Sequence, residues 1–116
     1  MVRYYRTKGI YDKADFLRLE VKYIKGKGYV VEINPTFKTE YSWGIIYGKE
    51  YYQYYNTLSY MVIPCGRRSE KKEKEACKIT EKKIDWLLEQ YVAMVDKKGG
   101  RHIEIIGEVK EWRKDG

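Results

Sequence analysis

Apolar and polar residues alternate along two neighbouring stretches early in the chain. The alternating apolar positions are Leu17, Leu19, Val21 and Tyr23 within residues 15–25, and Tyr29, Val31 and Ile33 within residues 29–34. A period of two is typical of strands that turn one face to a core and the other to water. Gly26 and Gly28 lie between the stretches and favour a tight turn, because glycine tolerates positive φ. We therefore expect an antiparallel hairpin, which Pro35 should end because proline has no N–H to donate.

Further strands are expected on both sides of this hairpin. Residues 2–7 fit either an extra edge strand or a loosely docked arm, and residues 57–63 favour a strand because they are rich in aromatic and β-branched side chains. Residues 37–46 predict a less regular third strand, and residues 102–106 a short last one. Residues 51–58 fit both a helix and a strand, so the pattern leaves their structure open.

A single stretch, residues 69–96, has the three- and four-residue apolar spacing of an amphipathic helix. Its apolar stripe consists of Ala76, Thr80, Ile84, Leu87, Leu88, Tyr91 and Val95. Ser69 is a suitable N-cap, because its hydroxyl can accept a hydrogen bond from the first turn, and the lysines and glycines of residues 97–100 mark the end. The pattern predicts an α+β fold with an antiparallel sheet of four to five strands packed on one long helix. We expect the order β-β-β-β-α-β in a single domain of residues 1–116.

The composition fits one folded domain with a basic surface. The chain has 116 residues, of which 43% are hydrophobic and 35% charged, and its formal net charge is +7. This is too apolar for a disordered chain. No run approaches the roughly 20 apolar residues of a membrane span, and the first residues lack the apolar segment of a signal peptide. Two cysteines are too few for a disulfide scaffold, so we expect a cytoplasmic protein with no membrane partner.

Catalytic chemistry finds little support in the sequence. His102 is the only histidine, and a surface or structural role fits it better than acid–base catalysis. Cys65 and Cys77 with one histidine do not complete a zinc site. We expect Cys77 to be a small buried apolar residue, and Cys65, beside two arginines, is the remaining candidate for a reactive thiol. No glycine-rich phosphate loop is found, so we expect no enzyme activity, no catalytic residue, no metal and no cofactor.

The candidate binding residues are basic and lie at the start of the predicted helix. They are Arg67, Arg68, Lys71, Lys72 and Lys74. Lysines there oppose the helix dipole at a cost of roughly a few tenths of a kcal/mol each, so their presence suggests a use. Together with the free N–H groups of the first turn, they favour a phosphate or carboxylate ligand. The alternative is a solvated helix face in which Glu70 and Lys74 form an ion pair.

Tyrosine is the dominant aromatic residue, with thirteen tyrosines against two phenylalanines. The densest group consists of Tyr51, Tyr52, Tyr54 and Tyr55. On an exposed strand these side chains would stack on bases or form a protein interface, including one with a second copy of the chain. The alternative is a core layer in which tyrosine takes the place of phenylalanine.

Short motifs spread over about two-thirds of the chain carry a family resemblance. They are Arg18-Leu19-Glu20-Val21, Gly28-Tyr29, Pro35, and Arg67 with Ser69, Lys71 and Ala76. In this arrangement the chain resembles a family of small uncharacterised proteins of gut bacteria and their mobile elements. That family has no established activity, so the resemblance implies a biological context and no particular chemistry.

A second resemblance lies in the way the predicted helix opens after the strands. The residues that carry it are Gly66, Ser69, Lys71, Lys74, Ala76 and Cys77. This layout is similar to the C-terminal half of the double-stranded-RNA-binding domain, which implies recognition of RNA by shape and backbone contact. The chain departs from that domain in two respects. The short segment before residue 15 cannot supply its first helix, and Glu70 and Glu73 stand where lysine and alanine are expected.

These observations favour a non-enzymatic binding protein over an enzyme. We expect the basic helix start to contact nucleic acid, another polyanion or an acidic protein. The alternative is a protein-interaction or anti-defence accessory protein of a phage or mobile element, which would act by protein–protein contact. In that case the tyrosines would form the interface, and a homodimer is one form it would take.

Overall fold

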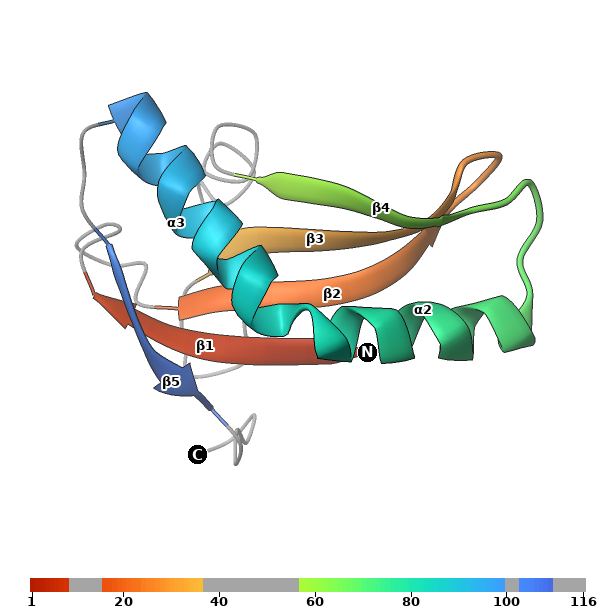
Figure 1. The fold of residues 1–116 in the computed structure, drawn as a ribbon, viewed down its shortest axis with the longest axis horizontal. Helices are drawn as coiled ribbons and strands as arrows, with labels where there is room; N and C mark the ends of the chain where they lie inside the picture. The colour runs from red at the N-terminus through yellow and green to blue at the C-terminus, as the bar shows by residue number, and fades with distance from the viewer. Residues whose placement is uncertain (9–15, 37–56, 100–102, 110–116) are drawn as a thin grey trace.

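A computed structural model of the chain describes residues 1–8, 16–36, 57–99 and 103–109. The strands are β1 (Val2–Lys8), β2 (Phe16–Ile24), β3 (Gly28–Thr36), β4 (Leu58–Pro64) and β5 (Glu104–Glu108), and the helices are α2 (Glu70–Lys82) and α3 (Ile84–Gly99). Figure 1 shows α2 running along the strands and α3 crossing them. The predicted class is confirmed: the fold is α+β, with an antiparallel five-stranded sheet and a helical region before the last strand.

The strands form one antiparallel sheet in the order β4-β3-β2-β1-β5. β1 is a strand, as one of the two alternatives predicted, but it lies inside the sheet because it pairs with both β2 and β5. The predicted hairpin of β2 and β3 is confirmed, with Tyr23 opposite Tyr29. The prediction that Pro35 ends β3 is wrong, since Pro35 pairs with Leu17 and the strand continues to Thr36. Proline is tolerated there because, in the described part of the chain, β4 does not extend alongside it.

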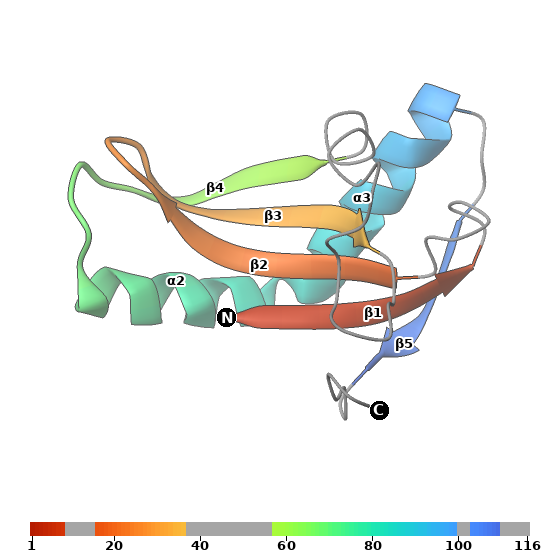
Figure 2. The same ribbon diagram turned by 180° about the vertical axis from the view of Figure 1, so that it is seen from behind.

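The alternating pattern of the strands determines which face of the sheet forms the core. The core residues are Tyr5, Leu17, Leu19, Val21, Tyr29, Val31, Ile33 and Ile103 from the sheet segments, and Ala76, Leu87, Leu88, Tyr91 and Val95 from the helices. Figures 1 and 2 show both helices on the same face of the sheet. Each large side chain fully buried there contributes roughly 1.5–3 kcal/mol. Val30, on the opposite face, is only 3% exposed. At this position the opposite face is therefore less exposed to solvent than the alternating pattern predicts.

The helix predicted for residues 69–96 is divided in two at Lys83. The N–H of Lys83 donates to the Thr80 carbonyl (2.9 Å), and its carbonyl accepts from the Leu87 N–H (2.8 Å), so α2 ends and α3 begins at this residue. The Lys83 ammonium also donates to the Tyr60 hydroxyl of β4 (3.1 Å). Because a sheet twists, one straight helix cannot cover it over its whole length. The break allows both halves of the apolar stripe to reach the core.

The remaining strand predictions divide into those that the structure tests and those that it does not describe. The strands predicted at residues 57–63 and 102–106 are confirmed as β4 and β5, the latter shifted by two residues. Outside the described ranges lie the strand at 37–46, most of residues 51–58, His102, and the candidate interface residues Tyr51, Tyr52, Tyr54 and Tyr55. Neither of the two described helices is long and apolar enough to span a bilayer.

Candidate anion-binding surface

The basic residues predicted at the helix start lie where three segments meet. Figure 1 shows the turn between β2 and β3 at the same end of the molecule as the connection from β4 to α2. The Cys65 N–H, in that connection, donates to the carbonyl of Lys27 in the turn (3.1 Å). Inside the turn the Lys27 N–H donates to the Ile24 carbonyl (2.9 Å). The connection and the turn are therefore joined through their backbones.

Gly28 allows this close approach. Its φ is 138°, a conformation that residues with a Cβ rarely adopt. A Cβ at this position would collide with the Ile63 carbonyl oxygen and lie 2.8 Å from the Cys65 nitrogen. Gly26, with φ of 77°, has open space around it, so its role is confined to the turn conformation.

Two core-facing tyrosines anchor the connection to the sheet. The Tyr29 hydroxyl accepts from the Ser69 N–H (2.8 Å) and donates to the Ser69 carbonyl (2.9 Å). The Tyr23 hydroxyl donates to the Gly66 carbonyl (2.9 Å) and accepts from the Gly26 N–H (3.3 Å). The two tyrosine rings pack with their centroids 5.3 Å apart. Both ends of the segment that carries Arg67 and Arg68 are thereby fixed.

Ser69 is the N-cap of α2, as predicted. Its Oγ accepts from the Lys72 N–H (3.3 Å), and its carbonyl accepts from the Glu73 N–H (2.9 Å). Glu70 and Glu73 occupy the first turn, where their negative charges interact favourably with the positive end of the helix dipole and stabilise the helix. Since Tyr29 holds Ser69, the start of the helix has a fixed position relative to the β2–β3 turn.

We define the basic end as the exposed lysines and arginines of these segments: Lys25, Lys27, Arg67, Arg68, Lys71, Lys72 and Lys74. The five residues predicted from the sequence lie in the β4–α2 connection and in the first turns of α2. The turn adds Lys25 and Lys27, which sequence reasoning missed because it treated the turn only as a link between strands. The Arg68 guanidinium lies 5.4 Å from the centre of the Tyr23 ring. This cation–π contact orients the arginine without neutralising it.

A row of lysines extends the basic end along α2. The row consists of Lys71, Lys74, Lys78 and Lys82. Spaced three and four residues apart, these lysines share one side of the helix, opposite the buried Ala76 and Thr80. The row spans roughly 16 Å along the helix axis. The spacing of these lysines is visible in the sequence, but only Lys71 and Lys74 of the row are among the residues predicted from it.

Among the described residues, no lysine of α2 forms an ion pair with a glutamate. Glu70 and Lys74, the pair considered as an alternative, are both exposed, and within the described residues no ion pair joins them. Glu81 pairs with Arg3 of β1 instead (3.0 Å), which ties the other end of α2 to the sheet. The ammonium groups of the lysine row therefore remain open to solvent and to an anion.

Both cysteines are free and half-buried. The Cys65 thiol donates to the Arg67 carbonyl (3.4 Å), and Cys77 packs against the core without being fully covered, so it is less buried than predicted. Among the residues with described positions, no group of histidine, cysteine, aspartate or glutamate side chains is arranged to hold a metal ion.

No protein-family model, curated protein or solved structure matches this chain. The residues before β2 that the structure describes form strand β1, where the double-stranded-RNA-binding domain has its first helix. The first of the two departures noted in the sequence, the absence of that helix, is therefore also seen in the described residues before β2.

Proposed function

We propose that this protein is a non-enzymatic binding protein that holds the phosphate backbone of a nucleic acid, or another polyanion, on its basic end. The observation that carries the proposal is the contact between the β2–β3 turn and the β4–α2 connection. It places the turn that carries Lys25 and Lys27 beside the connection that carries Arg67 and Arg68, although the two segments are far apart in the sequence. Dispersed lysine and arginine side chains are the groups that contact phosphate backbones in general.

The shape of the surface favours an extended anion over a small one. The basic groups are all exposed and are distributed over a turn, a connection and one side of a helix. The row from Lys71 to Lys82 covers roughly 16 Å. One strand of duplex nucleic acid carries about one phosphate per 3.4 Å of axis, so the row matches about five phosphates. Such contacts follow the backbone and do not read the base sequence.

The anchoring of the connection supports the same proposal. A mobile loop would lose conformational freedom when it bound its ligand, and this loss would weaken binding. Here Tyr29 fixes Ser69 and Tyr23 fixes Gly66, so the segment between them is ordered before any ligand arrives. The Arg68 guanidinium is also oriented in advance by its contact with the Tyr23 ring.

Retention on heparin at low salt tests the proposal, with a double variant that removes two charges from the basic end. Lys71→Gln/Lys74→Gln is compared with Lys8→Gln/Lys97→Gln, which removes the same charge from two exposed lysines elsewhere. Lys8 ends β1 and Lys97 lies near the end of α3, and Figure 1 shows these ends across the molecule from the β2–β3 turn. We expect wild type to be retained, and the first variant to elute at clearly lower salt than the second.

Two outcomes would contradict the proposal. Equal shifts for the two variants would mean that retention reflects net charge alone. If wild type is not retained even at low salt, the polyanion proposal fails. The alternative function, an accessory protein that acts through protein–protein contact, would then be favoured.

A further inference from the structure

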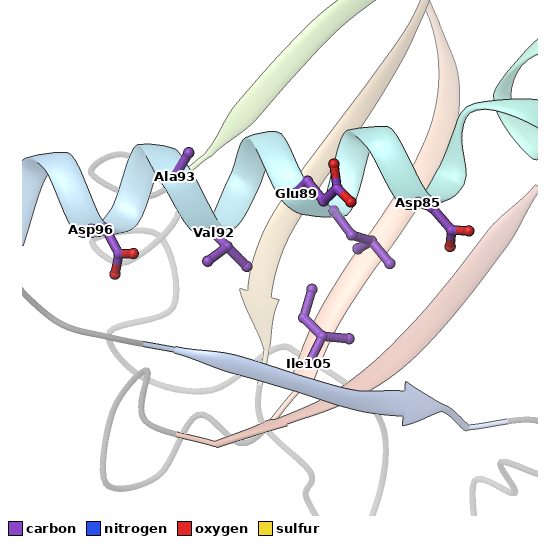
Figure 3. Close-up of a pocket in the computed structure, with 7 residues that line it drawn as sticks. Asp85, Glu89, Val92, Ala93, Asp96 and Ile105 are labelled. Atoms are coloured by element: carbon purple, nitrogen blue, oxygen red, sulfur yellow. The ribbon is translucent and has the colours of Figure 1, made fainter.

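A groove between α3 and β5 forms a surface of opposite character to the basic end. Its volume is about 540 Å³, and both α3 and β5 contribute to its lining. Figure 3 shows Val92 of α3 and Ile105 of β5 pointing towards one another in the middle of the groove. Asp85 and Asp96 lie towards its two ends, on the side of α3 that faces β5.

The floor of the groove is apolar and continuous with the core. Leu88 is 8% exposed and belongs to the core, while Val92 and Ile105 are half-buried and pack against it. In the described sheet β5 is the last strand, and Figure 3 shows it running alongside α3 with the groove between them. Apolar side chains at the bottom of an open groove lose exposed area when a further apolar group covers them.

The walls of the groove are acidic in a chain that is basic as a whole. Three of the residues that line the groove, Asp85, Glu89 and Asp96, are acidic, and none of its lining residues is basic. Asp85 and Glu89 are exposed and stand one helical turn apart along the groove. The formal net charge of the chain is +7, so the charge of the groove lining is opposite in sign to that of the chain as a whole.

We propose that the groove binds a short cationic amphipathic segment of a partner protein, in which apolar side chains alternate with lysine or arginine. The apolar side chains would cover Leu88, Val92 and Ile105, and the cations would face Asp85 and Glu89. The groove from Asp85 to Asp96 is roughly 16 Å long. About five residues of an extended peptide cover that length. The proposed site shares no residue with the basic end.

A second copy of the chain fits the groove less well. The basic end of another molecule would supply the positive charge but no apolar group, because the large exposed hydrophobic residues in the described ranges are Val2, Met61, Trp86 and Ile106. Antiparallel pairing of two β5 strands about Ile106 would place Glu104 opposite Glu108, and like charges facing one another are destabilising. Both arguments favour a different partner with its own apolar side chains.

Binding of a fluorescein-labelled heptapeptide of alternating lysine and leucine tests the proposal by fluorescence anisotropy. The variant Asp85→Asn/Glu89→Gln removes the two acidic groups, and Glu73→Gln/Glu75→Gln removes the same charge from exposed positions of α2. A second peptide with serine in place of leucine keeps the charge but cannot cover the floor. Thermal unfolding monitored by circular dichroism confirms that each variant is folded.

We expect saturable binding of the lysine–leucine peptide to wild type and at least about threefold weaker binding to Asp85→Asn/Glu89→Gln. The Glu73→Gln/Glu75→Gln variant should bind as wild type does, and the serine peptide should bind weakly to all three proteins. The proposal is overturned if wild type does not bind the first peptide, if both variants lose affinity equally, or if the serine peptide binds equally well. The proposal is also overturned if wild type self-associates and the Asp85→Asn/Glu89→Gln variant does not. That result would identify a second copy of the chain as the occupant of the groove.

Discussion

The Tyr29 hydroxyl is bonded to both backbone groups of Ser69, donating to its carbonyl at 2.9 Å and accepting from its N–H at 2.8 Å. Tyr29 belongs to β3 and is 1% exposed, and Ser69 is the N-cap of α2. One core side chain therefore sets the position of the helix start, and with it the position of the basic groups on the first turn.

Replacing Tyr29 with phenylalanine should destabilise the fold and disorder the helix start. The change keeps the ring in the core but removes the partner of the Ser69 N–H and one of the two donors to the Ser69 carbonyl, which keeps its bond from the Glu73 N–H, at an expected cost of about 1–3 kcal/mol. Urea unfolding measures this cost. Relative to wild type, amide hydrogen exchange in the variant should speed up more in residues 66–73 than in β2. Unchanged exchange in this segment would mean that the hydroxyl does not order the helix start.

Gly28 and Gly26 should respond differently to alanine substitution, although both have positive φ. Gly28→Ala combines a disfavoured conformation with collisions against the backbone of β4, so we expect a loss of about 3 kcal/mol or more. Gly26→Ala has free space and should cost only about 1–2 kcal/mol for its left-handed conformation. Chemical denaturation of both variants checks the difference. Equal costs would show that the turn and the β4–α2 connection do not pack as closely as described.

Tyr5 should make the fold sensitive to alkaline pH. Burial raises the pKa of its hydroxyl above the ordinary value of 10.0, and the nearby Glu108 carboxylate adds to this increase. The unfolded chain therefore loses this proton first, and stability falls as pH rises above 10.0 towards the folded-state pKa. Below that range Tyr5 contributes no pH dependence.

The Tyr5→Phe variant isolates this effect. Urea unfolding of wild type and variant at about pH 8 and about pH 10.5 should show a smaller loss of stability in the variant between the two pH values. An equal loss in both proteins would mean that the Tyr5 hydroxyl ionises as easily in the folded state as in the unfolded chain.

Local patterns were sufficient to predict most of the described elements. The period-two alternation in β2 and β3 and the glycines between them identified the hairpin, because each signal comes from neighbouring residues. The same is true of the Ser69 cap and of the apolar stripe, whose Tyr91 and Val95 are buried as predicted. The place of β1 inside the sheet was not predictable in this way, since it depends on pairing with β5 at the far end of the chain.

The break at Lys83 and the composition of the basic end also depend on tertiary structure. The apolar helical spacing continues through Lys83, so it gives no sign that α2 ends there; the break goes with the course of α3 across the sheet, which the sequence does not reveal. Lys25 belongs to the basic end because β4 pairs with β3 and so brings the β4–α2 connection back beside the β2–β3 turn, where Lys25 lies. A search for charge clusters along the sequence cannot find groups that come together in this way.

The dependence of duplex RNA binding on salt concentration tests the central proposal most directly. The dissociation constant of a fluorescein-labelled RNA duplex is measured by anisotropy between about 50 and 200 mM salt for wild type, Lys71→Gln/Lys74→Gln and Lys8→Gln/Lys97→Gln. If the basic end holds phosphates, the logarithm of the affinity of wild type falls linearly with the logarithm of salt. The slope should then become shallower by about two for the first variant and stay unchanged for the second. Absence of binding at the lowest salt, or the same slope for wild type and Lys71→Gln/Lys74→Gln, would contradict it.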